Sequence, residues 1–123
     1  MKRLLLVAAL LCATLLLTGC TADEIAFYNN VTASTRQALN DDQLYRLRMC
    51  ESEDNYQALS RGGVYRGAYQ FDVRTWNDVA SRHFQWLSGV DPAVTEPYWQ
   101  DSMARALFSE RGPQPWPVCG RQI

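Results

Sequence analysis

Residues 41–76 read DDQLYRLRMCESEDNYQALSRGGVYRGAYQFDVRTW and predict two helices with a glycine- and tyrosine-rich segment between them. Asp41 and Asp42 are expected to cap the first helix, which ends near Ser52. Apolar residues at helical spacing predict its inner face, formed by Leu44, Leu47 and Met49. In residues 53–71, glycines among aromatic residues favour a short hairpin or an ordered loop over a helix.

Two further helices follow from capping and breaking residues. Asp72 is the expected N-cap of the second helix, which Ser88-Gly89 ends; its buried positions are expected at Val73, Trp76, Val79, Ala80 and Phe84 or Leu87. The third helix starts at Thr95 and Glu96, because Pro97 suits a first helical turn, and Gly112-Pro113 stops it. Its buried stripe is expected at Tyr98, Met103, Ala106 and Leu107. The predicted fold class is α+β, mainly helical, in one domain over residues 41–123 with a tail that proline keeps from being helical.

The first twenty residues have the pattern of an export signal. A basic pair, Lys2-Arg3, precedes an apolar run from Leu4 to Leu17, which is shorter than the about 20 residues that a membrane-spanning helix needs. The ending Leu17-Thr18-Gly19-Cys20 resembles a bacterial lipobox, in which the cysteine becomes the lipidated first residue. We therefore expect a lipoprotein signal peptide at residues 1–19. The alternatives are an ordinary signal with a coincidental cysteine and an uncleaved anchor.

Lipidation of Cys20 predicts an extracytoplasmic protein held at the membrane by its lipid. Residues 20–40 are then the lipidated cysteine and a polar, flexible tether, with any helix near its end. Cys12 leaves with the signal, so Cys50 and Cys119 remain in a compartment that permits disulfides. A bond between them closes a loop of about 70 residues and contributes roughly 4 kcal/mol to stability. The alternative is two free thiols.

Composition excludes two classes of function. Without residues 1–20 the chain has ten basic and thirteen acidic residues, a net charge of −3, and all its bases are arginine. Nucleic-acid binding is not expected, because its affinity comes mainly from neutralised phosphates. His83 is the single histidine and the cysteines are dispersed, so neither a zinc site nor any other metal or cofactor is expected.

Glu51 is the carboxyl group best placed for chemistry. It directly follows Cys50, at the end of a helix and at the start of the aromatic segment. A carboxyl group walled by tyrosine and tryptophan has a raised pKa and stays a proton donor near neutral pH. Cleavage of a glycosidic bond needs such a donor, because the departing sugar alkoxide is a poor leaving group. The alternative is a solvated surface glutamate.

A set of motifs carries a family resemblance: Cys50-Glu51-Ser52, Asn55-Tyr56, Tyr65-Arg66-Gly67-Ala68-Tyr69-Gln70-Phe71-Asp72, Thr75-Trp76 and Trp116-Pro117-Val118-Cys119. In this order the set resembles the resuscitation-promoting factor family of actinobacteria, whose transglycosylase-like domains have a reduced lysozyme-type fold. The resemblance spans roughly residues 43–119. It implies a small lysozyme-like domain with three helices, a short hairpin or loop and one disulfide.

The resemblance implies roles for particular residues. Glu51 would be the general acid, and Cys50 and Cys119 would form the family disulfide. Asp72 and Thr75 fall on positions that line the family's glycan cleft. Gln70 and Tyr65 match its motif as further substrate-binding residues, although Tyr65 could serve packing alone. Trp76 lies on the apolar stripe of the second helix, so the core is expected for it rather than the sugar site.

The chain departs from the family pattern at several places, and the loop before Tyr65 is about one residue longer than usual. Glu53-Asp54 replaces a Gly-Gly pair, and the added negative charge is expected to raise the pKa of Glu51. Tyr56 replaces a tryptophan. Arg111 replaces a glutamine of the family's cleft.

The expected function is cleavage of the β-1,4 glycosidic bond of peptidoglycan by a monomer, as a lytic transglycosylase with Glu51 as its single acid/base. A muramidase would use a second carboxylate, for which Asp72, Asp54 and Glu53 are candidates, at a defined separation from the acid. A non-catalytic peptidoglycan-binding lipoprotein is a further possibility, to which Glu53, Asp54 and Arg111 point, and a purely structural lipoprotein is the last.

Overall fold

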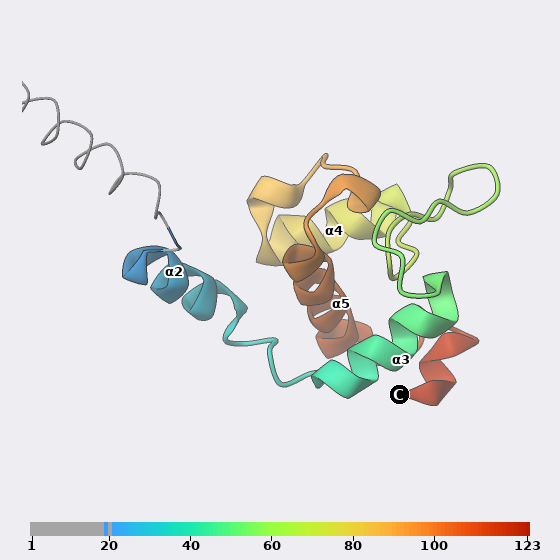
Figure 1. Cartoon of the computed structure of the whole chain (residues 1–123), viewed down its shortest axis with the longest axis horizontal. Helices are drawn as coiled ribbons and strands as arrows, with labels where there is room; N and C mark the ends of the chain where they lie inside the picture. Colours follow the sequence, from blue (N-terminus) through green and yellow to red (C-terminus); the bar gives the residue numbers. More distant parts are fainter. Residues whose placement is uncertain (1–18, 20) are drawn as a thin grey trace, which may run out of the picture. The chain divides into compact units, whose positions relative to one another are not determined.

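The computed structural model describes residues 19 and 21–123 (Figure 1). The chain consists of two compact units, residues 1–30 and 31–123. The predicted signal segment up to residue 18 and the predicted lipid site at Cys20 lie outside the described residues. No helix in the described part of the chain is long and apolar enough to cross a membrane.

Helix α2 (Ala22–Thr32) holds most of the described residues of the first unit. It starts where it does because Thr21 and Glu24 cap each other: the backbone N–H of Thr21 donates to Glu24 Oε2 (2.7 Å), and that of Glu24 donates to Thr21 Oγ1 (3.2 Å). The expectation of a helix only near the end of residues 21–40 is wrong. Residues 33–39 form turns instead.

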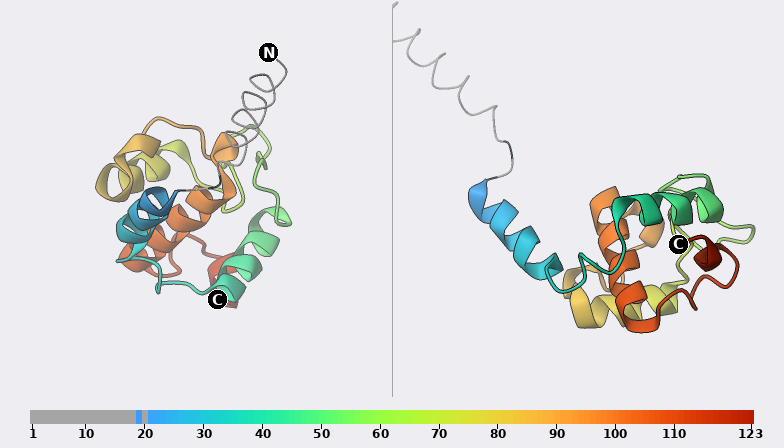
Figure 2. Two further views of the ribbon diagram at one scale, coloured as in Figure 1. Left: turned by 60° about the vertical axis from the view of Figure 1, so that its left-hand side comes forward. Right: turned by 90° about the horizontal axis from the view of Figure 1, so that it is seen from below.

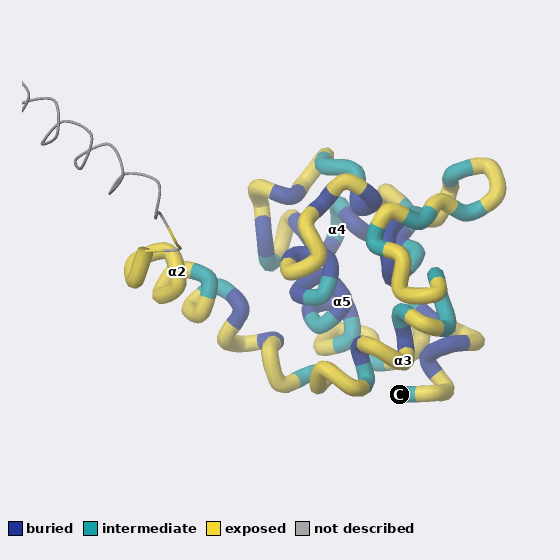
Figure 3. The backbone as a smooth tube through the Cα atoms, viewed as in Figure 1, coloured by how far each residue is buried: buried dark blue, intermediate teal, exposed yellow. Residues whose placement is uncertain are grey.

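The second unit is mainly helical, as predicted. Its α-helices are α3 (Asp41–Ser52), α4 (Val73–His83) and α5 (Pro97–Arg111), and short 3₁₀ turns cover Gln85–Leu87, Pro92–Val94 and Cys119–Gln122. Helix α5 lies between α3 and α4 (Figures 1 and 2), and seven of its 15 residues are buried (Figure 3). The last 3₁₀ turn lies beside α3, where the predicted Cys50–Cys119 disulfide joins the two elements.

The segment between α3 and α4 is an ordered loop whose β structure is limited to two antiparallel bridges, Leu59 to Arg66 and Arg66 to Phe71. Gln100 on α5 braces this loop from inside the core. It is 1% exposed, its Oε1 accepts the N–H of Ala68 (2.9 Å), and its Nε2 donates to the carbonyls of Tyr56 (2.9 Å) and Thr95 (2.7 Å). The sequence allowed either a short hairpin or an ordered loop, and the structure shows the ordered loop.

Several details of the predicted helices are wrong. Helix α3 is capped by Asn40, whose Oδ1 accepts the N–H of Gln43 (2.9 Å), so Asp41 and Asp42 belong to the first turn. Helix α4 ends at His83, before Ser88-Gly89, although Asp72 caps it as predicted. Three predicted inner residues are about half exposed: Met49, Val73 and Tyr98. Trp99 is buried where the sequence predicted Tyr98 to be. Successive residues of a helix point about 100° apart, so these two neighbours face different sides of α5.

The core agrees with the rest of the predicted positions. Leu44 and Leu47 of α3 are buried, as are Trp76, Val79 and Ala80 of α4 and Met103, Ala106 and Leu107 of α5. Phe84 and Leu87 are both buried, but they follow α4. Trp76 is fully buried and donates from Nε1 to the carbonyl of Leu87 (3.0 Å), so it is a core residue as expected.

Candidate active site

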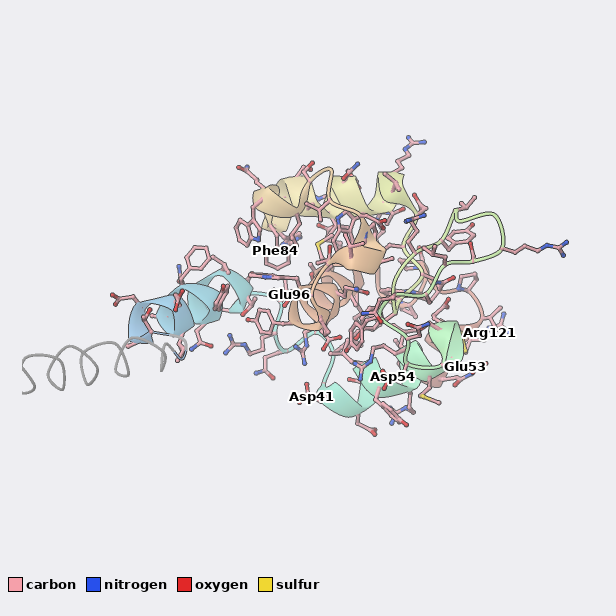
Figure 4. The ribbon with its side chains drawn as sticks, turned by 45° about the horizontal axis from the view of Figure 1, so that its top comes forward. Asp41, Glu53, Asp54, Phe84, Glu96 and Arg121 are labelled. Atoms are coloured by element: carbon pink, nitrogen blue, oxygen red, sulfur yellow. A yellow bond between two sulfur atoms is a disulfide. The ribbon has the colours of Figure 1, made fainter. Side chains whose placement is uncertain are left out.

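Glu51 lies in the last turn of α3, and the residues around it hold that turn in place. The chain leaves the helix through Glu53 and Asp54, whose φ angles of 55° and 62° are left-handed (Figure 4). The Ser52 hydroxyl donates to the carbonyl of Ala68 (2.8 Å), which ties the helix end to the loop. Cys50, which precedes Glu51, forms a disulfide with Cys119 of the C-terminal tail.

A partly buried polar cluster fixes the same end of α3 to α5. The guanidinium of Arg48 donates to Asp54 (2.6 Å), to the Tyr69 hydroxyl (3.0 Å) and to Asp101 of α5 (3.4 Å). Asp101 also accepts the hydroxyls of Tyr56 (2.8 Å) and Tyr69 (2.6 Å). Because Arg48 precedes Glu51 by about one turn, this cluster restrains the backbone that carries Glu51.

Glu51 lines a pocket of about 300 Å³ together with Tyr65, Gln70 and residues 115–119. The wall therefore comes from three parts of the chain: the end of α3, the loop and the proline-rich tail. The disulfide holds the tail against α3, together with a hydrogen bond from Arg46 Nε to the carbonyl of Gln122 (2.9 Å). Glu51 is the one acidic residue among those that line this pocket.

The surroundings of Glu51 shift the pKa of its carboxyl group upward. Burial raises its pKa above the ordinary value, and within the described part of the chain no hydrogen bond or cation stabilises the anion. The sequence analysis expected Glu53 and Asp54 to raise this pKa. The direction is confirmed, but the cause is burial, and Asp54 forms an ion pair with Arg48.

Two further pockets continue from the first. One of about 120 Å³ shares Tyr65, Gln70, Pro115 and Trp116 with it. The next, of about 520 Å³, shares Asp72, Thr75 and Arg111 with the second and adds Arg74 and Asp78. We call these three adjoining pockets the groove. All the candidate site residues named from the sequence line it: Glu51, Tyr65, Gln70, Asp72 and Thr75.

The pKa of Asp72 shifts in the opposite direction from that of Glu51. Burial opposes its ionisation, but both carboxylate oxygens accept hydrogen bonds from Thr75, from its N–H (2.9 Å) and its hydroxyl (2.7 Å). The net effect lowers the pKa of Asp72, because these bonds stabilise the anion. Asp72 is therefore an ionised N-cap of α4. It lines the second pocket of the groove but not the pocket of Glu51.

Tyr65 and Gln70 occupy the middle of the groove. Tyr65 is 50% exposed and lines the first two pockets, so part of its side chain is accessible in the groove. Gln70 has a left-handed φ of 52°, and its amide donates to the carbonyl of Gly67 (3.0 Å). A non-glycine residue in this conformation is strained, and such strain gathers at functional sites.

The sequence analysis missed several residues of the groove. Pro115, Pro117 and Val118 line the Glu51 pocket; the signals that could place them there were the predicted disulfide and the motif Trp116-Pro117-Val118-Cys119. Arg74 gave no signal, since one exposed arginine in a helix is ordinary. The described residues also contain no group of histidine, cysteine, aspartate and glutamate side chains able to hold a metal ion.

Comparison with known proteins gives the family. The family model described as transglycosylase-like domain matches residues 38–119, about two thirds of the chain. No curated protein matches the chain. The matched range contains α3, the loop, α4, α5 and both disulfide cysteines, so it covers the whole groove. The chain belongs to the family of transglycosylase-like domains, and its domain is a small lysozyme-like one that acts on peptidoglycan.

Proposed function

We propose that the protein is a lytic transglycosylase that cleaves the β-1,4 glycosidic bond of peptidoglycan with Glu51 as its single acid and base. The observation that supports this most is the state of Glu51. It is the one acidic residue in its pocket, and burial keeps its proton on at a higher pH than usual. A proton donor is the first requirement for breaking a glycosidic bond.

In the proposed reaction, Glu51 donates its proton to the bridging oxygen while the bond from that oxygen to C1 of the muramic acid breaks. The Glu51 carboxylate then takes the proton of the C6 hydroxyl of the same sugar. The C6 oxygen bonds to C1 and gives a 1,6-anhydro ring. Glu51 ends protonated and no water is consumed, so no second carboxylate is needed.

The placement of Asp72 argues for this mechanism over hydrolysis. A muramidase needs a second carboxylate near the same bond to act as nucleophile or to activate water. Asp72 lines the second and third pockets but not that of Glu51, and both its oxygens already accept hydrogen bonds from Thr75.

The test is mass spectrometry of the products after purified peptidoglycan is incubated with the oxidised protein. We expect 1,6-anhydromuramic ends, and we expect Glu51→Gln to slow their release by about 10²–10⁴-fold, because the amide cannot donate the proton. Glu53→Gln is the matched control: Glu53 is two residues away, exposed and outside the pocket, so that variant keeps wild-type activity. Reducing ends would instead show a hydrolase, and absence of products from folded protein would show a glycan-binding protein.

We also propose that a lipid on Cys20 holds the domain at the outer surface of the membrane. The support is the sequence Leu17-Thr18-Gly19-Cys20 after a short apolar run. Cys20→Ser should abolish incorporation of a labelled fatty acid into the protein. Unchanged labelling in that variant would contradict a lipid on Cys20.

A further inference from the structure

The third pocket of the groove contains both acidic and basic side chains. The acidic side chains use more of their hydrogen-bonding atoms within the protein than the arginines do. It is lined by Asp72, Arg74, Thr75, Asp78 and Arg111. The oxygens of Asp72 accept the N–H and hydroxyl of Thr75. Those of Asp78 accept Arg82 (2.7 and 2.9 Å) and Arg111 (2.7 Å). The charge of Asp78 is thus paired with two arginines, whereas Asp72 keeps its negative charge, because the donors of Thr75 are uncharged.

The arginines of this pocket keep donors for a ligand. Arg74 is exposed, and none of the ion pairs among residues 19 and 21–123 includes it. Arg111 is 43% exposed in its side chain and uses one nitrogen on Asp78. A guanidinium has five N–H donors, so this single bond leaves Arg111 further donors.

We infer that Arg74 and Arg111 form a carboxylate-binding subsite beside the glycan path of the groove. This inference rests on the proposed function, because it takes peptidoglycan as the ligand. Each muramic acid carries a lactyl carboxyl group that either is free or continues into a peptide with carboxylates of its own. The planar guanidinium matches such a group with two parallel hydrogen bonds.

The position of the pocket fits a branch from the glycan. The third pocket joins the second through Asp72, Thr75 and Arg111, and the second joins that of Glu51 through Tyr65, Gln70, Pro115 and Trp116. A glycan with one sugar at Glu51 and others along the groove would bring a substituent within reach of Arg74. The subsite would therefore select muramic acid over plain N-acetylglucosamine at a point away from the chemistry.

The test is equilibrium binding to the full-length Glu51→Gln protein, which keeps the ligand whole. Three tetrasaccharides serve as probes. The first contains N-acetylglucosamine only, and the second alternates N-acetylglucosamine with N-acetylmuramic acid whose lactyl carboxyl groups are free. The third is the second with a tetrapeptide attached to each lactyl group. We expect tighter binding of the carboxylate-bearing probes. Adding Arg74→Gln or Arg111→Gln should reduce that preference by about tenfold, since each removes a charge-assisted pair. The lactyl probe and the peptide probe distinguish which carboxylate is bound.

Arg61→Gln is the matched control, because Arg61 is an exposed arginine of the loop outside the three pockets. It should leave the preference unchanged. The inference is overturned if the probes bind equally, if none binds, or if the preference survives both arginine substitutions. Because binding is measured without cleavage, the result stands apart from the product analysis that tests the lytic mechanism.

Discussion

Glu51 and Asp72 are the same kind of acid in opposite surroundings. Glu51 is half buried without a donor, and burial raises its pKa; Asp72 accepts two hydrogen bonds from Thr75, and its pKa is lowered. Environments that separate two carboxyl pKa values in this way make Glu51 the candidate acid of the pair and leave Asp72 ionised.

The pH dependence of cleavage follows from the protonation of Glu51. If Glu51 must be protonated to act, kcat/KM is high below its pKa and falls as the pH rises through it. Because the pKa is raised, the fall should lie above the about 4.3 of an ordinary glutamate. Steady-state rates on a soluble peptidoglycan fragment between pH 3 and 8 would measure this. A rate that rises with pH over this range would contradict Glu51 as the acid.

Glu53 holds a backbone conformation that suits glycine better. Its φ of 55° is left-handed, and its N–H closes the end of α3 by donating to the carbonyl of Met49 (3.2 Å). Glu53→Gly should raise the free energy of unfolding by about 1 kcal/mol, because glycine has no Cβ to clash there. Urea unfolding would measure the change. Glu53→Ala keeps the clash, so a glycine variant no more stable than the alanine variant would contradict this account.

At the scale of elements, α5 positions the loop that supplies the middle of the groove. Gln100 reaches from α5 to the backbone at Ala68 and Tyr56, and Asp101 joins the Arg48 cluster. Adjacent residues of α5 thus fix the loop and the end of α3. The two sides of the Glu51 pocket keep their separation because both are tied to this helix.

A pair of glycines tests how tightly the loop packs on α5. Gly67 and Gly89 both have φ of +80°, but a Cβ on Gly67 would lie 2.5 Å from Gln100 Oε1, whereas nothing lies within 4 Å of one on Gly89. Gly89→Ala should cost about 1–2 kcal/mol from its backbone alone. Gly67→Ala should cost a further 1–3 kcal/mol, roughly, by displacing the buried amide from its partners.

Thermal unfolding of both variants would measure these losses, and cleavage assays would show whether Gly67→Ala also displaces Tyr65 and Gln70. Equal losses in the two variants would mean that Gln100 does not brace the loop.

At the scale of the whole molecule, the disulfide is both a stabilising link and part of the site. It joins residues 69 positions apart and holds residues 115–119 against the end of α3. A bond that closes so long a loop contributes roughly 4 kcal/mol to stability by restricting the unfolded chain. In a domain of this size that is a large share of the total.

The double variant Cys50→Ala/Cys119→Ala should therefore unfold at a lower temperature than the oxidised protein. It should also lose cleavage at temperatures where circular dichroism shows it folded, because the tail wall of the Glu51 pocket is released. Differential scanning calorimetry and product analysis would measure the two effects. Full activity in the folded variant would show that the disulfide serves stability alone.

Local chemistry made much of this fold predictable from the sequence. The ends of α3 and α5, the Asp72 cap, most core positions and the Cys50–Cys119 bond were predicted, because each depends on a few neighbouring residues or on the cysteine count. The family's motif order also indicated which residues would share a site. Glu51, Tyr65, Gln70, Asp72 and Thr75 do line one groove.

The tertiary structure decided what depends on residues far apart in the chain. Periodicity could not show that Met49, Val73 and Tyr98 are exposed, because the width of a helix's buried face depends on what packs against it. Nor could it show that Asp101 meets Arg48, that burial raises the pKa of Glu51, or that Arg74 and Arg111 share a pocket. The sequence by itself determined the helices, the disulfide and the candidate for the acid. Only packing determined the groove, since burial and charge pairing depend on the whole set of neighbours.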